Sequence, residues 1–524
     1  MSVLLAAALA LPRIDYTAIL PELILLGGAL VLVTASALSW RQIPTEAYAS
    51  ATVGFGGAAL IASLVLVHDV SRHGPFTTVA QSIVVDGFSS FALVLVSTIV
   101  LLAAILAAGF LRREAIAGCE YYALALISCA GAMFMAAAND LILIFLGLEV
   151  LSIPLYVLAG LDRRRAASSE AALKYFILGA FSSAIFVYGI ALTYGATGST
   201  QLAEIAAFLA RNVVTNDGVL LGGLALLLVG FGFKVAAVPF HMWTPDVYQG
   251  SPSAAVGFMA SIAKVGAFAA ALRVFVSSFP TLRSSWQPVV WVLAVLTMGL
   301  GALLVLVQQD VKRLLAYSSI NHAGFILLGL QAASDRGVAA ALFYLFAYSL
   351  LVLGSFAVVV VVGGPGDEAH DVARYRGLAR TRPVLAAAFA LLLLAQAGVP
   401  FTTGFFSKFY VVLAAVAAHS YALAVIAVVS AAITAFFYLR LVFLMFAATA
   451  VPSPVGAADA DPSPAGVALL APAAPVASGA RAAEVEVSPW AATGIACCVV
   501  VTLLFGVWPQ PLIAFAHQAT LLIR

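Results

Sequence analysis

Seven ionisable residues of this 524-residue chain stand inside long apolar segments, where a charge is costly. They are Glu149, Lys174, Lys234, Lys264, Arg273, Lys408 and Arg440. A charge at the centre of a bilayer costs roughly 2.5–3.5 kcal/mol even on mild scales, so such groups face a bundle interior, pair up or line a hydrated path. A buried lysine is disfavoured in its charged form and can take up and release a proton at working pH. These residue types therefore indicate proton transfer.

Lys264 and Glu149 are the most central of these residues. Lys264 lies about ten residues into its apolar segment, which at 1.5 Å per residue is roughly 15 Å deep and near the midplane. Glu149 is similarly central in LILIFLGLEVLSIPLYVL. A glutamate close to a lysine favours the charged lysine, so a Glu–Lys pair is a possible switch, although the sequence leaves open whether Glu149 touches Lys234.

The other three cations have a simpler alternative. Arg273 and Arg440 lie towards the ends of their segments, and Lys174 follows a basic loop. Long cationic side chains in such positions can extend to the membrane surface. Whether these three residues are functional stays open.

Lys234 and Lys408 each lie beside residues that interrupt a helix. In GFGFKVAAVPFHMWTPD, Pro239 cannot donate an amide hydrogen bond to the carbonyl of Val235, so we expect a break. The residues ahead of Lys408 in AQAGVPFTTGFFSKFY are also helix-breaking or polar: Gly398, Pro400, Thr402, Thr403 and Gly404. Interrupted helices in two halves of a membrane protein indicate an ion pathway between the halves.

His322 is the remaining candidate for the relay. It lies about eight residues into an apolar segment, with Ser318, Ser319 and Asn321 nearby. Histidine titrates near neutral pH and could pass protons between two lysines, although a hydrogen-bonded core histidine is the alternative. His241 lies near the expected cytoplasmic edge, and its role stays open.

The elements that hold these residues are predicted to be transmembrane helices. The chain is 64% hydrophobic and 9% charged, whereas soluble proteins carry about 25% charged residues. Its net charge of +2 does not suggest nucleic-acid binding. Apolar runs of membrane-spanning length recur and are apolar all round. We therefore predict an all-α polytopic membrane protein with about 14 transmembrane helices, which begin near Leu20, Ala51, Phe88, Tyr121, Leu141, Ala171, Val219, Ala254, Val289, Leu314, Ala339, Val384, Leu423 and Ala491.

The basic residues predict the orientation, because cytoplasmic loops are enriched in Lys and Arg. Loops after even-numbered helices hold few cations: Arg72, Arg211, Arg283 and Arg336. Loops after odd-numbered helices hold the richer set: Arg41, Arg112, Arg113, Arg163, Arg164, Arg165, Lys312, Arg313, Arg374, Arg376, Arg380, Arg382 and Arg481. We therefore expect the odd loops in the cytoplasm and both termini outside.

Three further features are expected to be structural. Pro452 to Pro489 is rich in Ala, Pro, Ser and Gly and is predicted to be a flexible tether before the last helix. The run Ser2 to Leu11 lacks a basic start and is not expected to be a cleaved signal peptide. The cysteines lack metal-ligand spacing and are expected to be small buried apolar residues: Cys119, Cys129, Cys497 and Cys498.

Several stretches resemble one family of membrane proteins. FKVAAVPFHMWTPDVYQGSPSAAVGFMASIAKVGAF is similar to the most recognisable part of the subunit N family of bacterial proton-pumping NADH:quinone oxidoreductases, or respiratory complex I. FLGLEVLSIPLYVLAG, AALKYFILGAFSSAIFVYGIAL, VKRLLAYSSINHAGF and GVPFTTGFFSKF resemble it in the same order, so the resemblance covers about residues 15 to 510.

This resemblance implies an antiporter-like fold with two inverted five-helix repeats, each with a broken helix. It implies helices 1–3 in residues 1–120, repeats in 121–280 and 281–450, a loop in 451–488 and helix 14 in 489–524. The relay residues that the family implies are the five singled out above: Glu149, Lys234, Lys264, His322 and Lys408. No metal or cofactor is expected in this chain.

Related subunits fit less well. Subunits L and M carry a histidine near the start of helix eight, where this chain has VGFMASIAK. Subunit M has a glutamate at the position of Lys408, and subunit L has a lateral helix for which we expect no room before Arg524.

The implied function is proton translocation in a multi-pass protein of the bacterial inner membrane. FMN, iron–sulfur clusters and quinone would belong to partner subunits, since this chain has no dinucleotide, haem or iron–sulfur motif. Expected partners are subunits of the M and K type, the NADH-oxidising arm and the lipid bilayer. The alternatives are a stand-alone or multi-subunit cation/proton antiporter, a subunit of a membrane-bound hydrogenase complex, or a structural scaffold. The central Lys264 and Glu149 argue against the scaffold.

Overall fold

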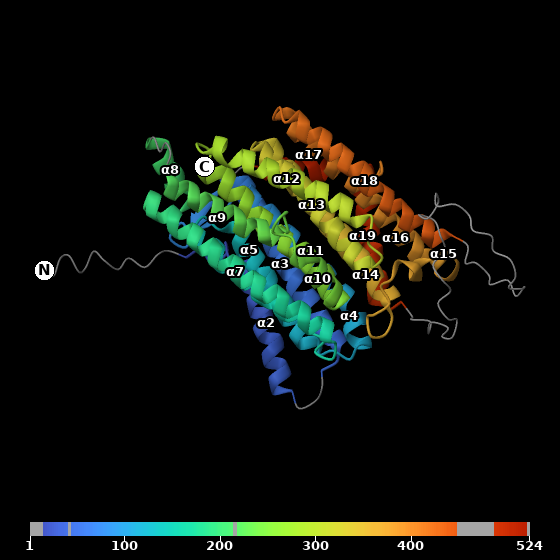
Figure 1. Cartoon of the computed structure of the whole chain (residues 1–524). Coiled ribbons are helices and arrows are strands. Elements are labelled where there is room, and N and C mark those ends of the chain that lie inside the picture. The colour runs from blue at the N-terminus through green and yellow to red at the C-terminus, as the bar shows by residue number, and fades with distance from the viewer. Residues whose placement is uncertain (1–13, 40–42, 213–216, 448–486, 521–524) are drawn as a thin grey trace, which may run out of the picture.

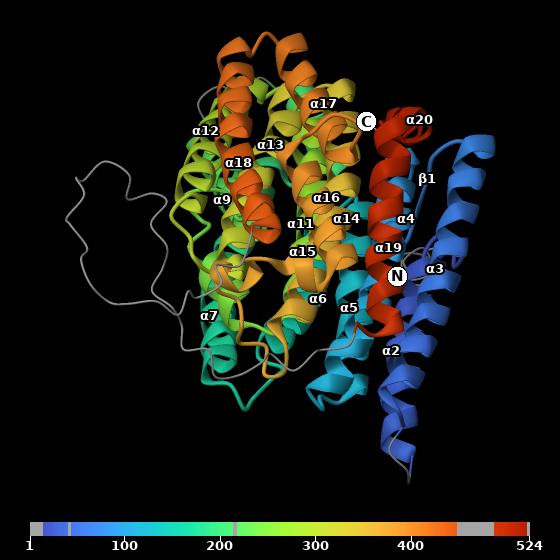
Figure 2. The ribbon, with the colours of Figure 1, turned by 90° about the vertical axis from the view of Figure 1, so that its right-hand side faces the viewer.

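The computed structural model describes residues 14–39, 43–212, 217–447 and 487–520. The run Ser2 to Leu11 and residues 452–486 of the predicted tether lie outside these residues. The described chain is a bundle of long helices (Figures 1 and 2). A short hairpin of β1 (Phe76–Thr78) and β2 (Ile83–Val85) pairs antiparallel before the third crossing.

Within the described residues, twelve helices are long and apolar enough to span a membrane. They are α2 (Leu20–Leu38), α3 (Thr45–His73), α4 (Gly87–Arg113), α5 (Gly118–Ala137), α6 (Leu141–Ala159), α7 (Ala166–Thr197), α9 (Gly218–Val235), α11 (Ser253–Arg273) with its π-helical extension η1 (Val274–Ser278), α12 (Arg283–Val305), α14 (Asp335–Gly363), α18 (Tyr421–Phe446) and α19 (Pro489–Val507).

The remaining helices complete the fourteen predicted crossings and connect them. The predicted tenth crossing corresponds to α13 (Val311–Ala332). The predicted twelfth corresponds to two shorter apolar helices, α16 (Pro383–Ala397) and α17 (Thr403–Ala417). The short elements are α8 (Leu202–Arg211), α10 (Trp243–Gly250), η2 (Val372–Tyr375), α15 (Leu378–Thr381) and α20 (Gln510–Gln518).

Polar residues begin several of these helices. Asp86, at the start of α4, accepts a hydrogen bond from the backbone of Ser89, and Ser89 reciprocates, which forms a capping box. The side chains of Asp140, Asp310 and Thr402 cap α6, α13 and α17 in a similar way. Such caps satisfy amide groups that the first helical turn leaves unpaired.

The centre of the bundle is formed by α11 and α14. The most apolar window of α11 is 100% buried and that of α14 is 89% buried, whereas those of α2, α3, α7 and α19 are 33% buried. In Figure 2, α2 and α3 lie at one edge of the bundle and α12 and α18 at the other, with α19 beside α4. Lys264, on α11, is therefore enclosed on all sides.

Both predicted helix breaks are present. The first separates α9 from α10, and Ala236 directly after α9 has a φ of 63°. The second separates α16 from α17, and Gly398 there has a φ of 93°, a left-handed conformation that glycine adopts without strain. Each break interrupts the fourth crossing of one predicted five-helix repeat. The exact repeat boundaries and their inverted relationship stay predictions.

One expectation about the cysteines is wrong in part. Cys119, Cys129 and Cys498 are buried, as expected, but Cys497 is exposed on α19. Adjacent residues of a helix point about 100° apart, so Cys497 and Cys498 cannot both face the bundle.

Candidate functional site

Glu149 and Lys234 lie close together without a direct ion pair among the described residues. Glu149, half-buried on α6, accepts a hydrogen bond of 2.5 Å from the hydroxyl of Ser183 on α7. A cavity of about 10 Å³ is lined by both Ser183 and Lys234. That is roughly the space of one water molecule. Ser183 therefore connects Glu149 to a water-sized space that Lys234 also lines.

Lys234 is buried at the end of α9, with 2% of its surface exposed. Its Nζ donates a hydrogen bond of 3.2 Å to the hydroxyl of Tyr175 on α7. The same Nζ lies 5.6 Å from the ring centre of Tyr156 and 5.3 Å from that of Tyr175, which stabilises a cation through the ring faces. The lysine therefore sits in an aromatic enclosure and not at the membrane surface.

Lys264 binds the backbone at the first helix break. Its Nζ donates to the carbonyl of Val235 at 3.3 Å and to the carbonyl of Ser319 at 2.7 Å. Val235 is the residue whose carbonyl Pro239 cannot serve, so the lysine occupies the place of a missing amide. Two neighbouring side chains satisfy other backbone groups that the break leaves without helical partners. Trp243 Nε1 donates to the carbonyl of Phe233 at 3.1 Å, and Thr297 Oγ1 accepts from Val238 N at 2.9 Å.

An aromatic path connects the surroundings of Lys234 and Lys264. The ring of Tyr175 stacks on Trp243 with centroids 4.5 Å apart, and Trp243 lies 6.4 Å from Tyr248. The Tyr248 hydroxyl is 3.4 Å from Ser319 Oγ, and Tyr348 donates to the same oxygen at 2.8 Å. Ser319 thus meets two tyrosines with its hydroxyl and Lys264 with its carbonyl.

His322 joins α13 to two further helices. Its Nδ1 is 2.7 Å from the hydroxyl of Tyr344 on α14, and its Nε2 is 3.2 Å from the hydroxyl of Tyr438 on α18. Ser319, which binds Lys264, and Phe325, whose ring lies near Lys408, are three residues before and three residues after His322 on α13. The histidine is buried and hydrogen-bonded, and it lies between the two lysines.

Lys408 repeats the arrangement of Lys264 at the second break. Its Nζ donates at 2.9 Å to the carbonyl of Ala397, the last residue of α16, and lies 5.1 Å from the ring centre of Phe325. The preceding residue, Gln396, accepts hydrogen bonds of 3.4 Å from both Tyr438 and Ser318. The helix end that Lys408 contacts is thereby linked to His322 through Tyr438.

Comparison with known proteins identifies the family. The sequence pattern described as "NADH:quinone oxidoreductase/Mrp antiporter, TM" matches residues 138–434. The chain is 40% identical to NADH-quinone oxidoreductase subunit N of Parafrankia sp. (strain EAN1pec), covering 97% of this chain and 95% of that protein. The chain belongs to the NADH-quinone oxidoreductase subunit N family. The subunit N of Mycobacterium bovis is 38% identical, covering 98% of this chain and 99% of that protein.

Solved structures agree with this family assignment. A chain of respiratory complex I from Thermus thermophilus, solved with bound aureothin, is 33% identical with a TM-score of 0.73, covering 94% of this chain and 98% of that one. A chain of the Mrp complex from Dietzia sp. DQ12-45-1b has a TM-score of 0.78 at 24% identity, covering 96% and 97%. At that identity the second likeness concerns the fold alone.

Three further intramembrane cations of this subunit N chain have different environments. Lys174 is exposed and pairs with Glu170 at 2.8 Å and Asp246 at 3.0 Å, and Arg440 is exposed on α18. Arg273 is 1% exposed, so the surface-reaching alternative is wrong for this residue. Its two terminal nitrogens each lie 2.9 Å from an oxygen of Asp86, because the start of α4 brings that carboxylate into the core.

His241 and Lys312 also lie in unexpected surroundings. His241 occupies the break between α9 and α10, where it is half-buried and its Nδ1 has no hydrogen-bond partner among the described residues. Lys312, expected in a loop, is fully buried in the first turn of α13 and donates 2.5 Å to the carbonyl of Ser251. α13 begins three residues before the predicted start at Leu314, which moves this lysine into the bundle.

Asp367 organises the loop after α14. Its carboxylate accepts hydrogen bonds from the backbone and hydroxyl of Ser253, at 2.8 and 2.7 Å, and so caps α11 from another part of the chain. Lys312 is 3.6 Å away and His370 is 3.1 Å away. Burial acts to raise the pKa of Asp367, but the charge of Lys312 and the hydrogen bonds from His370 and Ser253 outweigh it and hold the pKa well below its ordinary value.

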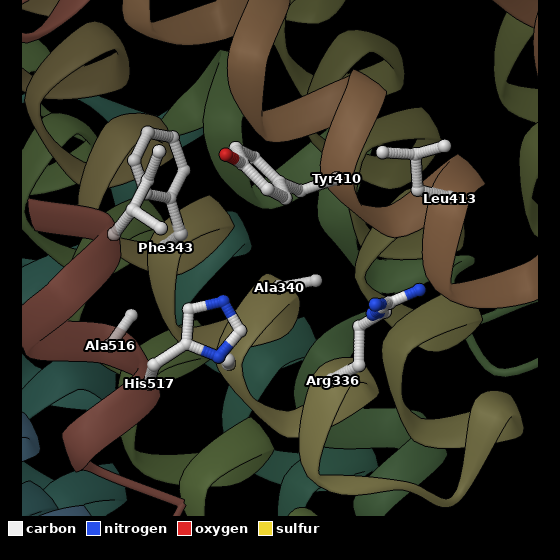
Figure 3. A pocket seen from close by; sticks show the side chains of 9 residues that line it. Arg336, Ala340, Phe343, Tyr410, Leu413, Ala516 and His517 are labelled. Carbon is white, nitrogen blue, oxygen red and sulfur yellow. The ribbon is translucent and has the colours of Figure 1, made fainter. Parts of the chain in front are cut away.

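Two hollows lie on opposite faces of the bundle. On the face of the basic loops, a hollow of about 330 Å³ is lined by charged residues that include Lys174, Asp246 and His370. On the other face, a hollow of about 200 Å³ lies between α14, α17 and α20. Figure 3 shows Arg336, His517 and Tyr410 around it. Tyr410 is two residues from Lys408 along α17.

Sequence reasoning missed the aromatic and polar residues that connect the candidate residues. The missed residues are Tyr175, Ser183, Trp243, Tyr248, Tyr344, Tyr348, Gln396 and Tyr438. Tyrosine is common in membrane helices, so composition does not separate a linking tyrosine from a packing one. A useful signal would have been two tyrosines one helical turn apart, which place two hydroxyl groups on one helix face, such as Tyr344 and Tyr348 on α14.

Proposed function

We propose that this chain translocates protons across the membrane as a subunit of NADH:quinone oxidoreductase. Relatives at 38–40% identity over nearly the whole chain carry the name of that enzyme's subunit N. Electron transfer from NADH to quinone takes place in partner subunits, which hold the FMN, the iron–sulfur clusters and the quinone. Neighbouring membrane subunits are of the M and K type.

The observation that carries this proposal is the row of titratable groups inside the bundle, all of them buried except Glu149, which is half-buried. It runs from Glu149 and Lys234 through Lys264 and His322 to Lys408. Isolated charges inside a membrane protein are expensive, so a whole row of them indicates a path for ions. All of its nitrogen-bearing members can gain or lose a proton, whereas a path for metal cations needs oxygen ligands.

The proposed relay uses the helix breaks as acceptors for the charged lysines. A protonated Lys264 is stabilised by hydrogen bonds to the carbonyls of Val235 and Ser319. These hydrogen bonds become weaker when the lysine loses its proton, because a charged donor bonds more strongly than a neutral one. His322 can accept a proton on one ring nitrogen while donating from the other, so it passes protons between Lys264 and Lys408. Glu149 sets the charge of Lys234 through Ser183 and the water-sized cavity that Ser183 and Lys234 line, which makes the pair a switch.

The two hollows supply the proposed ends of the path. Protons enter from the basic-loop face, which we assign to the cytoplasm, and leave through the hollow that Arg336, Tyr410 and His517 line. With this orientation both termini lie outside the plasma membrane.

Proton uptake by membrane vesicles tests the proposed relay. Lys264→Ala and Glu149→Ala should each abolish most NADH-driven proton pumping in a complex that still assembles. Arg440→Ala is the matched control, since it removes a cation that is exposed on α18, and it should pump normally. Unchanged pumping by the assembled Lys264→Ala and Glu149→Ala complexes would overturn the assigned roles.

The composition of the purified complex tests the enzyme assignment. Subunits that oxidise NADH should co-purify with this chain. A complex with hydrogenase subunits, or with membrane antiporter subunits alone, would instead support one of the alternative functions. Replacing sodium with choline in the pumping assay should change nothing, since protons are the proposed cargo.

A further inference from the structure

A long apolar groove separates α16 from α19 on the outside of the bundle. Its volume is about 880 Å³, and it is lined mostly by small and branched apolar residues: Pro383, Val384, Leu385, Ala387, Ala388, Leu391, Val487, Ala492, Ile495, Ala496, Val499 and Val500. Arg382 stands at its end. Figure 2 shows the two helices running beside each other along this side.

The length of the groove matches one leaflet of a bilayer. On α16 it extends from Arg382 to Leu391. Nine residues of helix rise roughly 13 Å. This is close to half of a hydrocarbon core about 30 Å thick. The groove starts at the basic-loop face, where α16 begins, and ends near the middle of the membrane. An acyl chain of the leaflet on that face would fill its depth.

The charge next to the groove favours an anionic headgroup, because Arg382 lines its end and further arginines precede it along the chain. Four arginines lie within nine residues ahead of α16: Arg374, Arg376, Arg380 and Arg382. Among the described residues, no carboxylate forms an ion pair with Arg374, Arg376 or Arg380, and all three are exposed. Basic clusters next to the cytoplasmic end of a membrane helix recognise anionic lipids.

The segment that carries the arginines is held in place. Tyr375 is buried with its ring 5.7 Å from that of Phe389 on α16. The amide of Gly377 donates to the carbonyl of Leu444 at the end of α18, at 3.1 Å. Because the arginine segment is fixed against α16 and α18, it can bind a headgroup without first being ordered, which reduces the entropic cost of binding.

We propose that the groove between α16 and α19 binds an anionic phospholipid of the basic-loop leaflet. Its phosphate lies among the arginines and an acyl chain lies between Ala388 and Ala496. The lipid packs against the outer side of α16, whose last residue holds Lys408 through its carbonyl. This site stands on the groove and its charges, and it does not depend on the proposed proton relay.

Photochemical cross-linking in the intact complex tests this proposal. A photoreactive amino acid is placed at Ala388, with the same probe at Ala432 on the exposed side of α18 as the control. The complex is reconstituted in nanodiscs that contain an anionic and a zwitterionic phospholipid in a known ratio. Adducts at Ala388 should be enriched in the anionic lipid, whereas those at Ala432 should match the bulk ratio.

Substitutions separate the contributions of charge and shape. Removing one arginine, as in Arg380→Gln, should reduce the anionic enrichment about fivefold, the factor expected for one basic residue near a membrane surface. Arg211→Gln, on the opposite face, should leave it unchanged. Ala496→Trp, which fills the groove, should abolish the lipid adduct at Ala388. Equal lipid ratios at both probe positions, or cross-links from Ala388 to protein instead of lipid, would overturn the proposal.

Discussion

The ammonium group of Lys264 donates a hydrogen bond of 3.3 Å to the carbonyl of Val235, where α9 ends. Lys408 makes the equivalent bond of 2.9 Å to the carbonyl of Ala397, where α16 ends. A helix break leaves carbonyls without amide partners, and in the membrane an unsatisfied carbonyl is costly. Each central lysine therefore has a backbone partner that a continuous helix could not offer, and the break and the buried cation stabilise one another.

The hydroxyl of Tyr438 should be needed for efficient transfer between His322 and the second break. Tyr438→Phe removes the bond to His322 and the contacts to Ser318 and Gln396. A hydrogen bond to a charged partner contributes about 1.5–3 kcal/mol, so we expect the pumping rate to fall at least about tenfold. Tyr421→Phe, an exposed tyrosine at the start of α18, is the control. Pumping is measured as the initial rate of vesicle acidification after NADH is added, and equal rates in both variants would contradict the prediction.

Gly404 should be intolerant of any side chain, because a β-carbon there would lie 1.7 Å from the carbonyl oxygen of Ala395. Gly404→Ala must push α17 away from α16, at a cost of about 1–3 kcal/mol. We expect a lower melting temperature of the purified complex and weaker proton pumping, since Lys408 follows on the same helix. Gly299→Ala on α12 meets no atom within 4 Å and should melt like the unmodified protein. A Gly404→Ala complex of unchanged melting temperature would show that the helices can separate freely.

Loss of one partner of the buried Arg273–Asp86 ion pair should destabilise the protein more than replacement of both partners by apolar residues. Removing one partner leaves an uncompensated charge in the core, so Asp86→Asn should cost about 3–5 kcal/mol. The exposed pair of Arg112 and Glu46 is the control, and Arg112→Gln should cost at most about 1 kcal/mol. Chemical denaturation of the complex in detergent measures both. A double variant, Arg273→Met with Asp86→Leu, should be more stable than Asp86→Asn, and a less stable double variant would argue against charge burial as the cause.

Asp367 should stabilise the protein above acidic pH. Its pKa is lower in the folded protein than the ordinary value of 3.8, so folding favours the ionised form. This stability is fully present above 3.8 and is lost as the pH falls from there through the lower pKa of the folded state. Asp367→Asn should therefore lower the melting temperature by a constant amount between pH 8 and pH 5, and the difference should shrink only in stronger acid. A difference that disappears already near pH 6 would contradict the prediction.

The helix breaks show how far local residues determine the fold. Pro239 and the Gly398–Pro400 run predicted both interruptions, because a missing amide and a glycine act within one helical turn. The sequence did not predict that the backbone groups of the first break would be satisfied by Lys264, Trp243 and Thr297. Trp243 lies on α10 just after the break, whereas Lys264 and Thr297 come from the following crossings α11 and α12, and only packing brings them to it.

The intramembrane cations show the same difference between what local sequence predicts and what packing decides. Hydropathy singled out Lys264 and Lys408 because a charge in an apolar segment is conspicuous in any sequence. It could not separate Arg273, which is buried, from Arg440, which is exposed, since both lie towards helix ends. That distinction depends on which neighbour faces each residue.

The sequence by itself determined the membrane-spanning helices, their two interruptions and the five titratable residues of the candidate relay, since each follows from local composition and the cost of placing charge in lipid. Only the tertiary structure decided how these residues are connected. Asp86 and Arg273 are 187 positions apart, and His322 and Tyr438 are 116 apart. Contacts over such separations depend on how whole helices pack, which no short stretch of sequence specifies.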